Sequence, residues 1–228
     1  RYGTPMALML LPHWTDGCIG SMEGLYFESS ASTPFHFLNQ STLSIAPSRA
    51  QRDLPYQNFD INRGVAQLQT VGVRYYMALT DEAIAAAEAH PDLVQVAEAQ
   101  PFVVFQVAGS ALVESLQFEP VIASGPTEDN ITEVSTRFDV GWESQAVSQY
   151  NDPLAYQALP AEDGPESWDR VTTLVGSDGA RIDAVQVSYI AVGRSSISFS
   201  VDQVGTPVLV KMSYFPNWGV SGAEGPYR

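Results

Sequence analysis

The sequence predicts an α+β protein, in which an N-terminal α/β layer is followed by an antiparallel β-sandwich part of the jelly-roll-like kind. The first 125 residues alternate helix-type and strand-type hydrophobic patterns, as α/β layers do. After Arg170 the apolar residues recur at every second position, which is typical of antiparallel strands with one buried face. A turn-rich stretch, residues 125–130, separates the two patterns. We therefore expect one subdomain over residues 1–125 and a second over residues 126–228, beginning with a helical linker.

The chain opens with an apolar run, residues 2–11, that we expect to form a buried strand closed by Pro12. A loop rich in glycine, serine and aromatic residues is expected over residues 14–37. Loops of this length are usually functional or tightly packed. This loop is therefore the first place to look for a site.

Local signals predict a regular succession of elements between residues 62 and 107. Apolar residues at three-to-four spacing after Asn62 predict a helix, with Gly72 as its C-cap. Thr80 is a good N-cap for a second helix, which must stop before Pro91. Stretches rich in β-branched and aromatic residues predict strands at 73–79, 93–97 and 102–107.

The C-terminal part is expected to begin with a helix around Trp142–Tyr150 and to continue as strands. Period-two alternation places these strands at 185–191, 195–202 and 207–215. The sequence stops in mid-pattern soon after the last of them. We therefore expect a sheet that is truncated at the C-terminus.

Charge and hydropathy exclude several classes of partner. The chain carries 26 acidic against 11 basic residues, for a net charge of -15. A field of this sign repels nucleic-acid phosphates and anionic lipid headgroups. The longest apolar run, Met6–Leu11, is far shorter than the roughly 20 residues that a membrane span needs.

The loop over residues 14–37 supplies the candidate ligand-binding residues. Its carboxylates could pair as in glycoside chemistry, or could cap turns and bind backbone NH groups. Its aromatic residues, Phe35 among them, could stack on sugar rings or could belong to the core. The candidates are Trp14, Asp16, Glu23, Tyr26, Glu28 and His36; no catalytic residue can be assigned.

The sequence predicts no cofactor and no metal site. Cys18 is the single cysteine, which excludes an internal disulfide, and we interpret it as a small buried residue in preference to a reactive one. The three histidines have no zinc-type spacing. The acidic stretch over residues 152–169 lacks the spacing of a calcium loop, so a solvated loop is the preferred interpretation.

Three stretches resemble a family of bacterial polytopic membrane proteins. Residues 68–77 and 209–218 resemble parts of large extracytoplasmic domains in proteins of the YfhO type, and residues 12–30 resemble an actinobacterial subgroup described as 6-pyruvoyl-tetrahydropterin-synthase-related. The resemblance implies a glycosyltransferase-C-like parent in the cell membrane, with this domain on the extracytoplasmic side. The zinc-binding histidines of the pterin enzyme have no counterpart here.

Three functional hypotheses follow, of which the first is preferred. The domain binds or positions a cell-envelope glycan or a lipid-linked sugar for the transmembrane helices of the same full-length chain, without catalysing the reaction itself. Alternatively, it is a structural or protein-interaction domain without a ligand. A third hypothesis is a glycan hydrolase that uses the Asp16, Glu23 and Glu28 loop.

Overall fold

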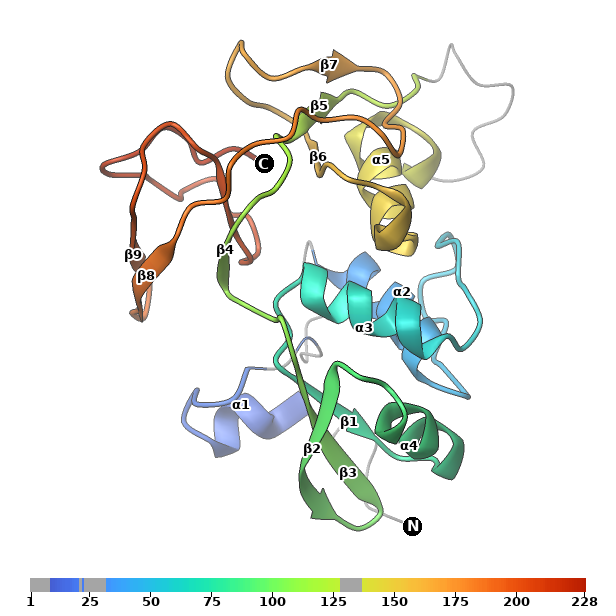
Figure 1. Cartoon of the computed structure of the whole chain (residues 1–228). Helices are drawn as coiled ribbons and strands as arrows, with labels where there is room; N and C mark the ends of the chain where they lie inside the picture. The colour runs from blue at the N-terminus through green and yellow to red at the C-terminus, as the bar shows by residue number, and fades with distance from the viewer. Residues whose placement is uncertain (1–8, 21, 23–31, 128–136) are drawn as a thin grey trace.

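The computed structural model describes residues 9–20, 22, 32–127 and 137–228, and the protein is α+β. Its helices are α1 (Leu11–Trp14), α2 (Thr33–Leu43), α3 (Ile61–Thr70), α4 (Asp81–Glu88) and α5 (Gly141–Asn151), with 3-10 turns at Arg137–Asp139 and Pro153–Ala155. Its strands are β1 (Tyr75–Ala78), β2 (Leu93–Ala99), β3 (Phe102–Val107), β4 (Val113–Ser115), β5 (Val121–Ala123), β6 (Pro160–Ala161), β7 (Arg170–Val171), β8 (Val187–Val192), β9 (Ile197–Val201) and β10 (Val208–Val210). Figure 1 shows their arrangement.

The best-formed layer is the antiparallel sheet β1-β3-β2, which packs against α3 and α4. One face of the sheet carries Tyr76, Phe105 and Val107, all buried in the same core as Leu68 of α3. Thr80 caps α4 by accepting a hydrogen bond from the backbone NH of Ala83 at 3.3 Å. The expected helices and strands between residues 61 and 107 are therefore confirmed.

Helices α2, α3 and α5 form a second layer, held by a buried polar network. At its centre lies Gln67, whose Nε2 donates to the Tyr150 carbonyl at 3.0 Å. The Oε1 atom of Gln67 accepts a hydrogen bond from Asn39 at 3.2 Å and lies 2.7 Å from the hydroxyl of Thr42. One side chain thus ties three helices together, because a buried amide must find partners for all its polar atoms.

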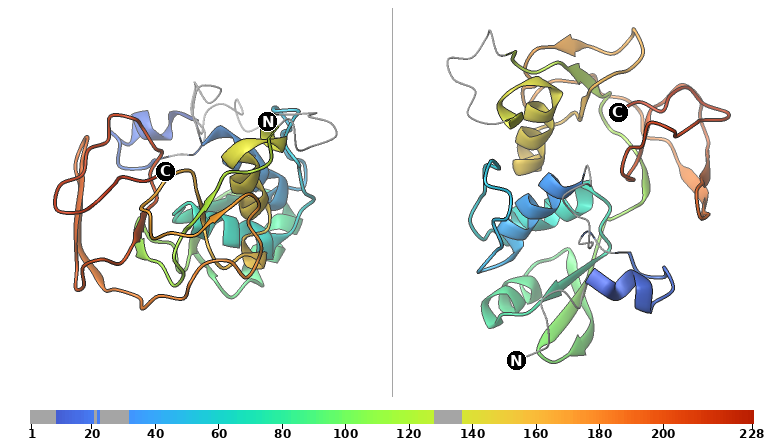
Figure 2. Two further views of the ribbon diagram at one scale, coloured as in Figure 1. Left: turned by 90° about the horizontal axis from the view of Figure 1, so that it is seen from above. Right: turned by 180° about the vertical axis from the view of Figure 1, so that it is seen from behind.

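Strands on the two sides of residue 125 pair with each other. β4 pairs antiparallel with β10, and β5 lies between β6 and β7, parallel to both. β8 and β9 form an antiparallel hairpin that contacts the rest of the chain through β4. Figure 2 shows this hairpin standing away from the helical layer.

The expected sandwich of residues 126–228 is not confirmed. The strands described there do not form two facing sheets: they join sheets of two or three strands, with β4 and β5 as partners from the first half. The predicted helix at 142–150 and the alternating strands at 185–191 and 195–202 are confirmed as α5, β8 and β9. The strand expected over 207–215 is shorter, because pairing with β4 covers only Val208–Val210.

Two expectations near the N-terminus are wrong where the structure describes them. Residues 9–14, of which 9–11 belong to the expected strand, form a helical turn and α1, and Pro12 sits in the first turn of that helix, where proline is tolerated. The rest of the expected strand lies outside the described residues. The expected loop over residues 14–37 gives way to α2 at Thr33. Helix α2 is buried on nearly all sides, so no amphipathic stripe marked it.

None of the helices in the described part of the chain is long and apolar enough to span a bilayer.

Candidate functional site

The candidate site is a wide cavity of about 2520 Å³ between two walls. Residues of α2, α3, α5 and β1 line one side, and residues 207–228, which we call the C-terminal segment, line the other. Residues 18–20, β3, β9 and the stretches 116–120, 159–168 and 203–206 also contribute to the lining. Pockets for small molecules usually measure about 300–1,000 Å³. The cavity is therefore better matched to an extended ligand than to a compact cofactor.

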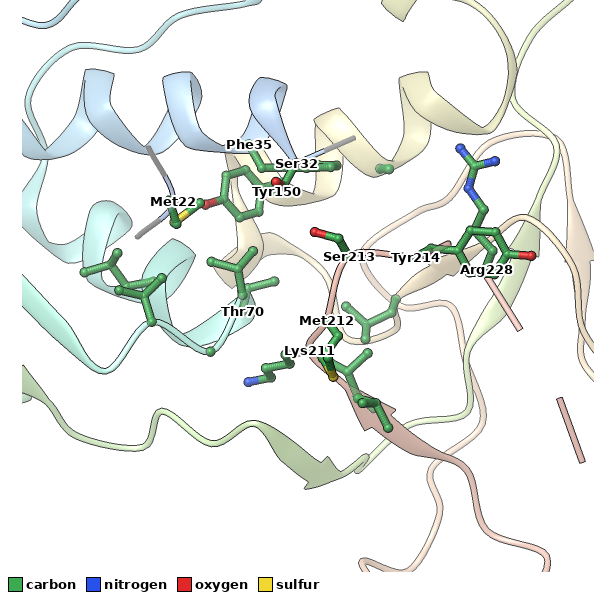
Figure 3. Close-up of a pocket in the computed structure, with 18 of the residues that line it drawn as sticks. Met22, Ser32, Phe35, Thr70, Tyr150, Lys211, Met212, Ser213, Tyr214 and Arg228 are labelled. Atoms are coloured by element: carbon green, nitrogen blue, oxygen red, sulfur yellow. The ribbon is translucent and has the colours of Figure 1, made fainter. Parts of the chain in front are cut away.

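The helical wall contains a buried tyrosine whose hydroxyl has no partner among the described residues. Tyr150 of α5 is 2% exposed, and its ring packs edge-to-face on Phe35 of α2 with the centroids 5.0 Å apart. Burial raises the pKa of the Tyr150 hydroxyl. Figure 3 shows both residues on the cavity wall, across from Lys211 and Met212. The wall therefore contains a packed aromatic pair, and the buried Tyr150 hydroxyl is not accessible from the cavity.

The opposite wall is fixed at one end by Lys211, the only lysine of the chain. Its side chain is 2% exposed, and its Nζ lies 2.7 Å from Oε2 of Glu114 on β4. The same ammonium donates to the carbonyl of Gln69 near the C-terminus of α3, where a cation is favoured. Lys211 thus joins β10 to β4 and to the helical layer.

The other end of this wall is held by Arg228. Its guanidinium lies 5.0 Å from the ring centroid of Trp142 and 5.7 Å from that of Tyr214. It also pairs with Glu162 at 2.9 Å, while the Arg228 backbone NH donates to Asp163 Oδ1 at 2.7 Å. Planar guanidinium groups suit this combination of ring face and carboxylate.

The neighbouring Tyr227 completes this cluster. Its ring lies 5.4 Å from that of Trp168, which is buried, and its hydroxyl donates to Glu224 at 2.5 Å. The hydrogen bond to the Glu224 carboxylate raises the pKa of Tyr227 to about 12. We call Tyr227, Arg228 and their partners Trp142, Glu162, Asp163 and Trp168 the Arg228 cluster.

The residues predicted from the sequence are only partly brought to the cavity. His36 of α2 lines it. Trp14, 60% exposed, and Asp16, in a turn with positive φ, lie at and just after the end of α1 and do not line it. Glu23, Tyr26 and Glu28 lie outside the described residues. The paired-carboxylate hypothesis therefore stays a prediction.

The interpretation of Cys18 as buried is wrong, because the thiol lies exposed in the short turn region after α1.

In the acidic stretch over residues 152–169, Asp152 approaches Arg63 at 3.8 Å, and Glu162 and Asp163 bind Arg228. Among the described residues no group of three His, Cys, Asp or Glu side chains could hold a metal ion. Three carboxylates of this stretch have side-chain or backbone partners in the chain itself.

Sequence reasoning did not single out Tyr150, Lys211 or Arg228 as residues of a site. Tyr150 belongs to a predicted helix, and its burial depends on α2, which was not predicted. Lys211 was conspicuous as the only lysine, but its partner Glu114 lies in another part of the chain. Tyr214 and Trp218 line the cavity from the C-terminal segment.

Comparison of the chain with models of protein families, with curated proteins and with solved structures finds no match.

Proposed function

We propose that this chain is an extracytoplasmic binding domain of a multi-spanning, glycosyltransferase-like membrane protein. It binds or positions a cell-envelope glycan or the sugar part of a lipid-linked sugar, and it leaves the chemistry to the rest of the parent protein. The membrane setting depends on the resemblance of residues 12–30, 68–77 and 209–218. The ligand class depends on the cavity.

The observation that carries the ligand class is the composition of the cavity walls. Half-buried or exposed rings, including Tyr214 and Trp218, line a space large enough for several sugar units. Flat ring faces suit the apolar face of a pyranose, and neighbouring polar groups such as Ser213 and Asn217 can bind its hydroxyls. The two basic residues of the C-terminal segment, Lys211 and Arg228, are both paired with carboxylates. A neutral ligand therefore fits better than a strongly anionic one.

The binding hypothesis is tested with neutral oligosaccharides of six or more units, prepared from mannan, galactan and arabinan, by calorimetry at low salt. We expect at least one of them to bind, and Tyr214→Ala to weaken that binding about tenfold. Phe215→Ala is the matched control, because Phe215 is exposed and does not line the cavity. Absence of binding by all three oligosaccharides would refute the ligand class.

A protein-interaction domain is the second candidate, and the hairpin β8–β9 favours it. Tyr189, Val192 and the following Val204 are exposed, which leaves apolar surface on a two-stranded unit. Isolated hairpins of this kind are only marginally stable in water.

Hydrolysis of a chromogenic glycoside by the chain would instead support the hypothesis of a glycan hydrolase that uses Asp16, Glu23 and Glu28.

A further inference from the structure

The sheet β1-β3-β2 carries apolar side chains on both of its faces. Tyr76 and Phe105 lie on the face that packs against α3 and α4. On the opposite face Met77 pairs with Val104, and Phe102 shares this face because it lies two positions before Val104 on β3. An antiparallel sheet with one face in the core usually carries polar residues on the other. The second face of this sheet therefore suits an apolar contact.

The side chains of this second face keep much of their surface free. Tyr75, Met77 and Leu79 follow one another at alternate positions in and just after β1, and they are 55%, 37% and 48% exposed. The polar residue paired with Tyr75 on this face is Gln106, which carries no charge. Contiguous exposed apolar surface of this kind marks a site of interaction.

This face borders the wide cavity of the candidate site. The residues that line the cavity from it are Tyr75, Met77, Leu79, Phe102 and Val104, which we call the apolar lobe. Alternate apolar residues of β9 line the same cavity, namely Ile197, Phe199 and Val201. A cavity bordered in this way suits a slender ligand better than the surface of a folded domain.

Charge also favours a slender neutral ligand over two broader occupants. Each chain has a net charge of -15, so a second copy and an anionic membrane surface are both repelled. Within residues 73–80 and 102–104, Arg74 is the only charged residue that lines the cavity. A hydrocarbon chain needs no charged partner and is stabilised by leaving water.

We propose that the apolar lobe binds a single long hydrocarbon chain, carried by a lipid with a neutral sugar head. The head contacts Tyr214 and Trp218 of the C-terminal segment, where Tyr214 lies beside Arg228 of the Arg228 cluster (Figure 3). This inference rests on the proposed function for the nature of the head. The site for the hydrocarbon chain depends only on the apolar lobe.

The first test measures the affinity of the unaltered chain for hexyl, octyl and decyl β-maltoside by calorimetry, below the concentrations at which these compounds form micelles. The three compounds share a neutral sugar head and differ only in the length of the hydrocarbon chain. We expect affinity to rise about two- to fourfold for each added methylene, because each one leaves water on binding.

The second test compares Met77→Gln with Val94→Gln. Val94 lies on the same face of the sheet, opposite Gln106, and is 57% exposed, but it does not line the cavity. We expect Met77→Gln to weaken the binding of decyl maltoside about fivefold, the equivalent of one to two methylenes. Val94→Gln should leave the affinity unchanged.

Equal affinities for the three maltosides would overturn the site for the hydrocarbon chain, and this comparison holds even if Met77→Gln folds poorly. Equal weakening by Met77→Gln and Val94→Gln would overturn it as well. So would sedimentation as a dimer, or flotation with phosphatidylcholine vesicles, that Met77→Gln abolishes, because the face would then contact a surface and not a single chain.

The site for the chain and the proposed function can fail separately. If octanol binds and Met77→Gln weakens that binding, while no oligosaccharide binds, the apolar lobe stands and the sugar ligand fails. If an oligosaccharide binds while the length of the alkyl chain has no effect, the sugar ligand stands and the apolar lobe fails.

Discussion

Replacement of Lys211 gives the sharpest test of how the C-terminal segment is joined to the helical layer. Lys211→Met keeps the length and apolar stem of the side chain and removes its charge. Breaking a buried ion pair by removing one partner typically costs about 3–5 kcal/mol. The stranded Glu114 keeps 34% of its side chain exposed and can be hydrated, so we expect a loss of about 2 kcal/mol.

The reciprocal change should cost more. Glu114→Gln leaves the ammonium of Lys211 buried, 2% exposed, with the Gln69 carbonyl as its remaining partner. We expect a loss of about 3 kcal/mol or more. The double variant, in which neither charge is left alone, should be about 1 kcal/mol more stable than Glu114→Gln.

Urea unfolding at pH 7 measures the three free energies, and thermal unfolding supports them. For a chain of this size about 1 kcal/mol shifts the Tm by about 2–4 °C, so Lys211→Met should lower it by about 4–8 °C. The reasoning is refuted if Lys211→Met unfolds within about 0.5 kcal/mol of the unaltered chain, or if Glu114→Gln is the milder of the two changes.

Three further predictions concern single positions. Tyr150→Phe should raise the free energy of unfolding by about 1 kcal/mol, because it removes a buried hydroxyl without a described partner. Tyr76→Phe should lower the free energy of unfolding by a similar amount, because the Tyr76 hydroxyl donates to the Leu43 carbonyl at 2.7 Å. A destabilised Tyr150→Phe variant would contradict this reasoning. Burial raises the pKa of Tyr76 from 10.0 to about 12, so the contribution of this group to the free energy of unfolding is complete below pH 10 and is lost as the pH rises from 10 to 12. In urea unfolding across this range, the stability of Tyr76→Phe should therefore fall less steeply with pH than that of the unaltered chain. Gly125→Ala should lower the free energy of unfolding by more than about 3 kcal/mol, since φ is +70° and the new Cβ would lie 1.8 Å from the Gly141 carbonyl oxygen. Gly205→Ala, with φ +81° and open space around the new Cβ, should lower it by only about 1 kcal/mol. Equal Tm values for these two variants would show that the close approach at Gly125 is absent.

The parts of the fold that the sequence predicted are those that local chemistry determines. Gly72, with φ +73°, ends its helix as expected, and Thr80 caps the next one. Pro91 follows the end of α4, and the strands β1 and β3 alternate buried and more exposed residues. Each of these features depends on neighbours within a few residues, so it can be predicted without the rest of the chain.

The parts that could not be predicted depend on distant partners. Helix α2 is stabilised by Gln67 and by packing on α5, and its polar residues Asn39 and Thr42 are buried, so hydrophobic periodicity gave no sign of it. β5 is a three-residue strand whose parallel partners come about 40 to 50 residues later. Of the candidate site only Phe35 and His36 were singled out, because the rest of its lining comes from parts of the chain that are far apart in the sequence.

The pairing of β4 with β10 sets a delay during synthesis. The ribosome must add roughly 95 residues between the end of β4 and the end of β10, which takes about 5–20 s at typical rates of elongation. Throughout this interval β4 lacks its partner strand, while the sheet β1-β3-β2 can already fold from contacts within its own stretch. A nascent chain paused before residue 208 therefore presents β4 to other chains, and stalled translation at that point favours aggregation more than stalling after Val210.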